Sequence, residues 1–341
     1  MRAMGDSLAR AHGGAVVSAR FKLEPEDFEV EEITGFEPSG EGEHAWLQVE
    51  KRGANTEWVA ARLAEFAGVP GSVVGFAGLK DRHALTRQVF TVQLPGQADP
   101  DWSALPVPGV RVLSATRHAR KLKRGALRGN RFRIRLREVD GDRGAVPARL
   151  DRVATHGVPN YFGEQRFGRE GGNLDLARAL FAGRRLGRAQ RGFALSAARA
   201  AIFNAVLDAR VATGTWDQPL EGEVWMLDGS HSVFGPEPWN EALAARLAGG
   251  DIHPTGPMWG RGELRSEHQA RVLERGIADT CADLAKGLEA AGLAQERRAL
   301  RLPVRGLEWT WEGDDGLLLA FELDPGSFAT VVLRELCEWA P

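Results

Sequence analysis

The sequence predicts an α+β fold in which a mixed, mostly antiparallel sheet with flanking helices is interrupted by a mainly helical insertion. Strand-like alternation of apolar and polar residues dominates up to about residue 150, helical periodicity dominates residues 151–304, and alternation returns near Gly306. Because the last strands need partners, we expect them to rejoin the first sheet. Residues 1–150 and 305–341 are therefore predicted to form one discontinuous domain, with residues 151–304 as a second domain inserted into it.

The composition is that of a soluble globular protein. The 341 residues suffice for about two domains, 43% of them are hydrophobic, 26% are charged, and the formal net charge is -2. Cys281 and Cys337 lie far apart without CxxC or histidine spacing, which argues against a disulfide framework and a zinc site. The apolar segment at residues 13–17 is too short for a signal peptide, and no run is long enough to span a membrane. We expect a cytoplasmic monomer without membrane contact and with a loose leader at residues 1–18.

The first predicted elements are two strands and a helix. Residues 28–33 alternate in the manner of a strand, with Phe28 and Val30 on one face. A second alternating strand follows at residues 45–50. A helix then runs from a polar cap to a glycine followed by proline, over residues 55–68. These elements lead directly into a polar loop.

This polar loop, residues 75–86, lies between two strand-like segments, so sheet would hold it on both sides. Asp81 is its only carboxylate and stands between Lys80 and Arg82. Cations within a few Å lower the pKa of an aspartate, although neighbours in an extended chain point to opposite faces. We expect Asp81 to be ionised at neutral pH. Taken alone, the loop also fits a charged hairpin turn.

A strongly basic stretch follows, from Arg117 to Arg137. It contains ten Lys or Arg residues and no Asp or Glu, which predicts a local positive field in a nearly neutral protein. Its last part, residues 131–137, alternates arginines with apolar residues and predicts an exposed row of guanidinium groups about 6 to 7 Å apart. The alternative is an edge strand protected by charge. Arginines after a basic loop favour phosphate recognition over that alternative.

The second half of the chain changes character. A turn-rich aromatic segment at residues 158–168 precedes helices, the longest of which is predicted to begin at Ser196. Residues 214–262 are rich in Gly, Pro and Trp and are predicted to be irregular. Residues 307–323 predict a hairpin, and a final helix carries Phe328 in its first turn.

Common catalytic signatures are absent from the sequence. There is no P-loop, no dinucleotide fingerprint after a strand and no GxSxG elbow, and the histidines have no metal-ligand spacing. We therefore expect no metal, no nucleotide cofactor and no other cofactor. A lone carboxylate, basic rows and phenylalanines in turns suit an enzyme that acts on a nucleobase.

Two longer motifs carry a family resemblance. FAGLKD at residues 76–81 resembles the catalytic loop of the TruD family of tRNA pseudouridine synthases, and PNYFGEQRFG at residues 159–168 resembles the second signature of that family. Further matches are PEDF at residues 25–28, ALRGNRF at residues 126–132 and GSFAT at residues 326–330. The matches follow the family's order from residue 20 to 335, but residues 214–300 carry none.

The resemblance implies that the chain converts a uridine of tRNA to pseudouridine, at position 13 in this family. It also implies a pseudouridine-synthase sheet interrupted by a family-specific insertion. Breaking the N1–C1′ bond and rejoining through C5 is an isomerisation, which requires no redox cofactor. By analogy Asp81 is the nucleophile or base. Attack on the sugar, attack on the base and proton removal to a glycal intermediate all stay open at this point.

The resemblance also assigns substrate contacts. It places Phe28 and Phe328 at the active site, where stacking of roughly 1 to 3 kcal/mol per ring would offset the few kcal/mol needed to unstack the uridine. Asn130 offers a donor and an acceptor for a uracil edge or a ribose hydroxyl. Lys22 is the candidate partner of Asp81, since an ion pair at about 4 Å contributes on the order of 4 kcal/mol at a dielectric of about 20. Without the resemblance, the same residues would be assigned as core phenylalanines, a turn asparagine and a solvated lysine.

We expect tRNA as the partner, with the basic stretch on its backbone. The candidate backbone contacts are Arg120, Lys121, Lys123, Arg124, Arg128, Arg131, Arg133 and Arg135. The alternative function is a non-catalytic RNA-binding protein that uses residues 117–137. A carboxylate-dependent glycosidase would need a second, paired carboxylate, and none stands out.

Overall fold

The structure is a computed structural model and describes residues 8–339. Its internal packing forms two compact units. The sheet unit comprises residues 16–146, 304–326 and 337–339, and the helix-rich unit comprises residues 8–15, 147–303 and 327–336. Residues 8–15 and 327–336 thus pack with the helix-rich unit, whereas the sequence had assigned both segments to the discontinuous domain.

The expected loose leader is only partly within the described residues, because residues 1–7 lie outside them. The part that is described is well packed. His12 is buried, its backbone N–H donates to Glu335 Oε2 at 3.1 Å, and its Nε2 lies 2.8 Å from the carbonyl oxygen of Gly157. The expectation that residues 8–15 have little to bury is therefore wrong, because small and polar residues are here drawn in by backbone hydrogen bonds.

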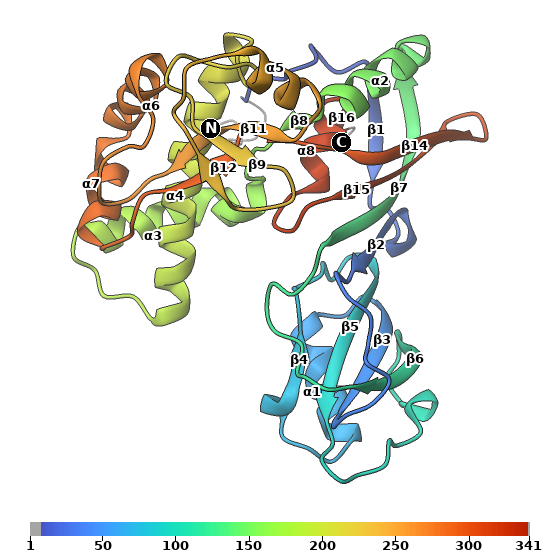
Figure 1. Ribbon diagram of the computed structural model, residues 1–341. Coiled ribbons are helices and arrows are strands. Elements are labelled where there is room, and N and C mark those ends of the chain that lie inside the picture. Colours follow the sequence, from blue (N-terminus) through green and yellow to red (C-terminus); the bar gives the residue numbers. More distant parts are fainter. Residues whose placement is uncertain (1–7, 340–341) are drawn as a thin grey trace. The chain divides into compact units, whose positions relative to one another are not determined.

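A ten-stranded sheet forms the sheet unit (Figure 1). Its main order is β14 (Arg305–Glu312), β15 (Gly316–Leu323), β7 (Gly129–Gly141), β2 (Phe28–Ile33), β5 (Leu85–Gln93), β3 (His44–Arg52) and β6 (Val110–His118). Off this path, β1 (Val17–Phe21) pairs with β7 and β16 (Cys337–Trp339), and β4 (Val74–Phe76) pairs with β5. Among the described strands of this sheet, β1–β16 and β2–β5 are parallel and the other pairs are antiparallel. The α+β class, the mixed and mostly antiparallel sheet and the return of the last hairpin to it are confirmed.

The core of the sheet follows the alternation along β7. Phe132, Ile134 and Leu136 are buried, and each faces an equally buried residue of β15. Phe132, for example, stacks on Phe321 with ring centroids 5.5 Å apart. Because β7 pairs with β15 on one side and β2 on the other, it lies inside the sheet and does not form its edge.

Helix α1 (Thr56–Phe66) covers part of this sheet, as its periodicity predicts. Val59 and Leu63 are fully buried in a cluster with Leu47 of β3 and Phe90 of β5. The helix gives way to Gly68 at φ +67°, a left-handed conformation that glycine adopts without strain.

The helix-rich unit contains most of the described helices, including the longest. They are α2 (Val146–His156), α3 (Gly172–Phe181), α4 (Arg188–Ala212), α5 (Glu241–Ala248), α6 (His268–Thr280), α7 (Ala282–Ala290) and the short α8 (Ala329–Arg334). Helix α4 packs against α3, α6, α7 and the strand β11 (Ile252–Met258) (Figure 1). It begins eight residues before the predicted start at Ser196, because residues 188–195, which include Arg188 and Arg191, are already helical. By length and composition α4 could span a membrane, but Ile202, Phe203 and Leu207 are fully buried, which makes it a core helix.

The prediction that residues 214–262 are irregular is wrong. They contain β9 (Trp225–Leu227), β10 (Val233–Phe234) and β11, which form a four-stranded sheet with β12 (Glu296–Ala299) in the order β10-β9-β11-β12. A further pair joins β8 (Val158–Pro159) to β13 (Arg301–Leu302). Strand β11 contains Pro254 and Pro257, and proline normally argues against a strand, which explains why the pattern was missed.

We expect Ile134→Ala to lower the free energy of unfolding by about 2 to 5 kcal/mol, because Ile134 is fully buried between β15 and β2. The measurement is urea unfolding followed by circular dichroism. Arg133→Ala, at the next position on the opposite face, is the matched control and should cost about 1 kcal/mol or less. Equal losses for the two variants would contradict this assignment of faces.

Candidate active site

The loop that carries Asp81 is mounted on the pair β4–β5. Val74 and Phe76 pair with Val92 and Phe90, so the chain leaves and re-enters the sheet at fixed points. Gly75 is required here, because a Cβ atom at this position would lie only 2.5 Å from the carbonyl oxygen of Leu122. The predicted placement of a polar loop between two strands is confirmed.

Asp81 is paired with Lys22. The Lys22 ammonium lies 2.5 Å from Asp81 Oδ2, and the backbone N–H of His83 donates to Oδ1 at 2.9 Å. Burial by itself would raise the pKa of Asp81, but the hydrogen bonds from Lys22 and His83 outweigh it and hold the pKa below the ordinary value. The carboxylate is therefore ionised at neutral pH. A quarter of the Asp81 side chain is exposed, so it is neither sealed in the core nor fully solvated.

The cations adjacent to Asp81 in sequence do not make this pair. Lys80 instead forms a buried ion pair with Glu32 at 2.7 Å, and Arg82 donates to the carbonyl oxygen of Gly53. The charge state predicted for Asp81 is therefore correct, but the cations adjacent to it in sequence are not its cause. The pairing cation comes from the end of β1, almost sixty residues earlier.

Lys22 also connects Asp81 to Phe28. Its ammonium lies 4.1 Å from the centroid of the Phe28 ring, and Lys22 itself has a left-handed backbone at φ +59°. The Phe28 ring packs edge-on against Phe21 and tilted against Phe132, and only 7% of the residue is exposed. Phe28 therefore lies at the base of the site as a largely buried ring, with Lys22 over it.

The backbone of the loop is fixed by buried polar groups. Thr56 Oγ1 accepts from the backbone N–H of Lys80, and Gln88 Nε2 donates to the carbonyl oxygen of Gly78. Thr56 in turn donates to Gln88, at 2.8 Å. The fully buried Lys51 donates to the carbonyl oxygen of Asp81 at 3.0 Å. Such contacts hold Asp81 in place independently of the ion pair on its carboxylate.

The burial of Lys51 and Glu32 near the loop was not predicted, although the alternation of the two strands contains a signal for it. Lys51 continues the alternation that buries Leu47 and Val49, and Glu32 continues the face of Phe28. A charged residue in register with a core face marks a buried polar site. Desolvation lowers the pKa of Lys51 to about 8, against the opposing charge of Asp81.

Asn130 is brought to the same face by strand register. It lies opposite Glu32 in the β2–β7 pair, and Glu32 is bound to Lys80 beside Asp81. Asn130 Oδ1 and Glu32 Oε1 are buried and have no hydrogen-bond partner among the described residues. Both atoms can accept a hydrogen bond from a bound molecule or from water.

The arginine row on β7 is neutralised by neighbouring strands. Arg131 pairs with Glu322 at 2.7 Å, Arg133 with Glu29 at 2.9 Å, and Arg135 with Glu312 at 2.5 Å. The proposed edge-strand alternative is wrong because β7 is internal, and the row is not a set of free cations because each guanidinium faces a carboxylate across the sheet.

The basic loop before β7 is more open. Arg120, Lys121, Lys123, Arg124 and Arg128 are all exposed. Lys121 donates to the carbonyl oxygen of Ser72, and the Arg124 guanidinium lies 3.7 Å from the Phe76 ring centroid with only a solvent-exposed contact to Glu57. This loop presents positive charge that the sheet does not neutralise.

Phe328 lies in the helix-rich unit, as the N-terminal cap residue of α8. Its half-buried ring contacts the segment of residues 159–168, where a Cβ on Gly163 would lie 3.5 Å from it. The contacts within the sheet unit bring together Asp81, Lys22 and Phe28, whereas Asn130 is linked to them only through Glu32 and Lys80, and Phe328 is not part of that set.

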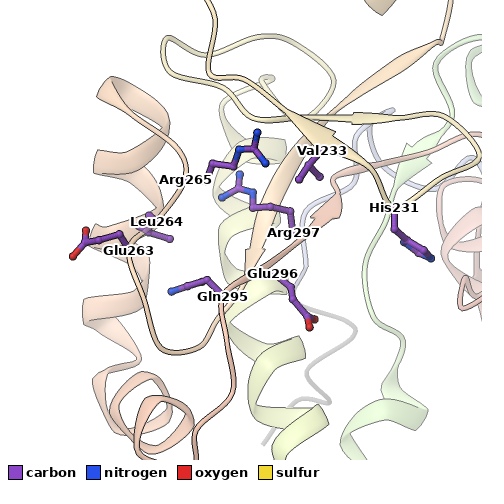
Figure 2. A pocket seen from close by; sticks show the side chains of 8 residues that line it. All are labelled: His231, Val233, Glu263, Leu264, Arg265, Gln295, Glu296 and Arg297. Atoms are coloured by element: carbon purple, nitrogen blue, oxygen red, sulfur yellow. The ribbon is translucent and has the colours of Figure 1, made fainter.

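Figure 2 shows a pocket of about 490 Å³ in the helix-rich unit that contains none of the residues discussed above. It is lined by His231, Val233, Glu263, Leu264, Arg265, Gln295, Glu296 and Arg297. The guanidinium groups of Arg265 and Arg297 lie side by side in this view, but Arg297 is neutralised by Glu274 at 2.7 Å. Among residues 8–339, no group of three or more His, Cys, Asp and Glu residues is arranged to hold a metal ion.

Comparison with known proteins identifies the family. The family model of tRNA pseudouridine synthase D (TruD) matches residues 11–183 and 173–336. The tRNA pseudouridine synthase D of Xanthomonas axonopodis pv. citri (strain 306) is 55% identical, over 96% of this chain and 94% of its own length. The protein of the same name from Methylococcus capsulatus (strain Bath) is 49% identical, over 98% of this chain and 96% of its own length.

A solved structure supports the same fold. A tRNA pseudouridine synthase D from Methanosarcina mazei superposes with a TM-score of 0.75 at 22% identity, covering 96% of this chain and 95% of that one. The matched family model and the two bacterial relatives each extend over nearly the whole sequence. The chain therefore belongs to the TruD family of tRNA pseudouridine synthases, which are isomerases that modify tRNA.

Proposed function

We propose that the chain isomerises uridine 13 of tRNA to pseudouridine with Asp81 as the catalytic carboxylate. The observation that carries this proposal is the partly exposed, ionised Asp81 on a rigid loop, paired with Lys22, whose ammonium lies over the Phe28 ring. In the reaction the N1–C1′ bond breaks and a C1′–C5 bond forms. The C5 proton is lost and N1 gains a proton, so atoms and electrons balance without an oxidant or a reductant.

Asp81 must be anionic to begin this reaction by any route. A carboxylate can attack C1′ of the ribose, add to the uracil ring, or remove a ribose proton to give a glycal. Lys22 fits the role of a group that keeps Asp81 ionised and oriented before the substrate arrives.

The other matched residues fit a uridine that has left its stack. Asn130 has a buried carbonyl oxygen without a partner among the described residues, which suits an N–H or O–H donor of the nucleotide. Phe28 can offer only the small exposed part of its ring, whereas Phe328 is more accessible and fits a stacking role better. Stacking by Phe328 requires its ring to reach the same nucleotide as Asp81.

We assign the tRNA backbone to the basic loop that contains Arg120, Lys121, Lys123, Arg124 and Arg128. Its exposed charges are free to contact phosphates. For Arg131, Arg133 and Arg135 a phosphate contact would have to compete with an existing carboxylate partner, so we expect them to contribute less.

The remaining assignments complete the proposal. Residues 151–304 are the family-specific insertion, and residues 1–150 and 305–341 are the catalytic domain, although residues 8–15 and 327–336 of the latter pack with the helix-rich unit. The enzyme acts in the cytoplasm as a monomer. A non-catalytic RNA-binding protein is the second candidate function, because the exposed basic loop alone would support it.

Replacing Asp81 tests catalysis against simple RNA binding. We expect Asp81→Asn to reduce the release of tritium from tRNA labelled at uridine C5 by on the order of 10³-fold or more, while tRNA binding persists. Asp101→Asn is the control, since Asp101 caps a short helical turn, and it should keep full activity. No release by the unaltered protein would favour the RNA-binding alternative, and undiminished release by the Asp81 variant would remove Asp81 from the mechanism.

The pH profile tests the role of Lys22. Activity that needs ionised Asp81 is present above its lowered pKa and disappears as the pH falls through that value. Lys22→Met removes a hydrogen bond that lowers the pKa while leaving burial, which raises it, so the acid limb of kcat/KM should move to higher pH. Lys121→Met, at an exposed lysine, should leave the limb in place. An acid limb that does not move in Lys22→Met contradicts the proposed role.

Salt dependence tests the basic loop. Combined Lys123→Gln and Arg128→Gln should flatten the plot of log binding constant against log salt by about 0.7 to 0.9 for each phosphate that the protein no longer binds. Arg133→Gln is the matched comparison, because its guanidinium is already paired with Glu29, and should change the slope less. A larger change in slope for Arg133→Gln than for the double variant would instead assign the backbone contacts to the arginine row on β7.

A further inference from the structure

The segment of residues 159–168 contains a cation that has no counter-charge among the residues that the structure describes. Arg166 lies in a short helical turn, Glu164–Phe167, and its side chain is partly buried. Its Nη1 donates to Ser196 Oγ at 2.9 Å, whereas its Nε is buried without a partner among the described residues. Within residues 8–339 no carboxylate pairs with Arg166, and desolvation is the one cause that lowers its pKa.

A second guanidinium lies close to the first. Arg298 of β12 has its guanidinium carbon 4.2 Å from the centroid of the Phe162 ring, and that of Arg166 lies 5.2 Å from the same centroid. Arg298 Nη2 donates to Asn160 Oδ1 at 2.6 Å. Burial and the nearby charge of Arg166 lower the pKa of Arg298 to about 10. The two guanidinium groups, which carry the same charge, therefore lie close to the same Phe162 ring.

Two other buried arginines of this unit are each paired with a carboxylate. Arg210 pairs with Glu223 at 2.9 Å and Arg297 pairs with Glu274 at 2.7 Å, and all four side chains are almost fully buried. A desolvated charge is normally balanced in this way, because burying it alone is costly. Arg166 departs from this pattern while remaining accessible from solvent, which suggests that its counter-charge comes from a bound anion.

We propose that Arg166, with Arg298 beside it, forms an anion site in which Arg166 binds a phosphodiester of the tRNA next to Phe328. The planar guanidinium group matches two phosphate oxygens, and Ser196 and Asn160 hold the two arginines in place before the ligand arrives. The Phe328 ring centroid lies 6.0 Å from the Arg166 guanidinium. A backbone phosphate held here would leave an adjoining nucleoside beside that ring.

This inference rests on the proposed function only in that tRNA supplies the phosphate. The site would serve for holding the backbone and not for chemistry, so it gives the segment of residues 159–168 a role separate from that of Asp81. It also separates the helix-rich unit's contribution to RNA binding from the basic loop of the sheet unit.

The test compares Arg166→Gln, Arg166→Lys and the unaltered full-length protein. With Arg166→Gln we expect the salt slope of tRNA binding to fall by about 0.7 to 0.9, which is roughly 5- to 8-fold weaker binding at 0.1 M salt. Arg166→Lys keeps the charge and should keep the slope. Arg246→Gln is the matched control, because Arg246 is paired with Asp251 on the surface of the same unit. An unaltered slope in Arg166→Gln overturns the proposal.

A second measurement does not depend on tRNA or on a folded variant. Inorganic phosphate should raise the thermal unfolding midpoint of the unaltered protein more than chloride does at the same ionic strength. No such difference overturns the anion site. Tritium release separates the two proposals. Normal release by the unaltered protein with an unaltered salt slope in Arg166→Gln refutes only the anion site, and no release by the unaltered protein with a reduced slope in Arg166→Gln refutes only the catalytic function.

Discussion

The contact between Lys22 and Asp81 is the interaction on which the site depends. The environment that shields the Asp81 carboxylate from water would by itself favour its neutral form, and a neutral acid could neither attack nor accept a proton. The folded sheet keeps the carboxylate ionised because it places Lys22, which directly follows β1, beside the loop between β4 and β5. Lys51 and Thr56 then hold the loop backbone, so the carboxylate is both charged and fixed in direction.

Charge is balanced locally through most of the molecule. Lys80 is matched by Glu32 in the sheet, and Arg210 by Glu223 in the helix-rich unit. The net charge of -2 conceals this pairing and also its exceptions. The basic loop before β7 and Arg166 are two places where described positive groups lack such matching, and both fit contact with a polyanion.

The sequence allowed the local structure to be predicted better than the long-range contacts. Alternation identified β2 and β7, helical spacing identified α1, and the polar run between strands located the Asp81 loop, because each signal lies within a few neighbouring residues. The partners of Arg131 and Arg133 could not be predicted, since Glu322 and Glu29 reach them only through the strand order of the folded sheet. Register also decides that Asn130 lies opposite Glu32, and no local pattern encodes register.

The parallel pair of β1 and β16 has a consequence for synthesis. Val17 lies opposite Cys337 and Phe21 stacks on Trp339, so the strand that delivers Lys22 is flanked by residues from near the far end of the printed sequence. A nascent chain on the ribosome can pair β1 with β7 early, but its other neighbour, β16, is synthesised much later than β7. Final placement of Lys22 therefore waits for residues that are synthesised long after β1, and intermediates without a paired β16 would expose an open strand edge that chaperones can recognise.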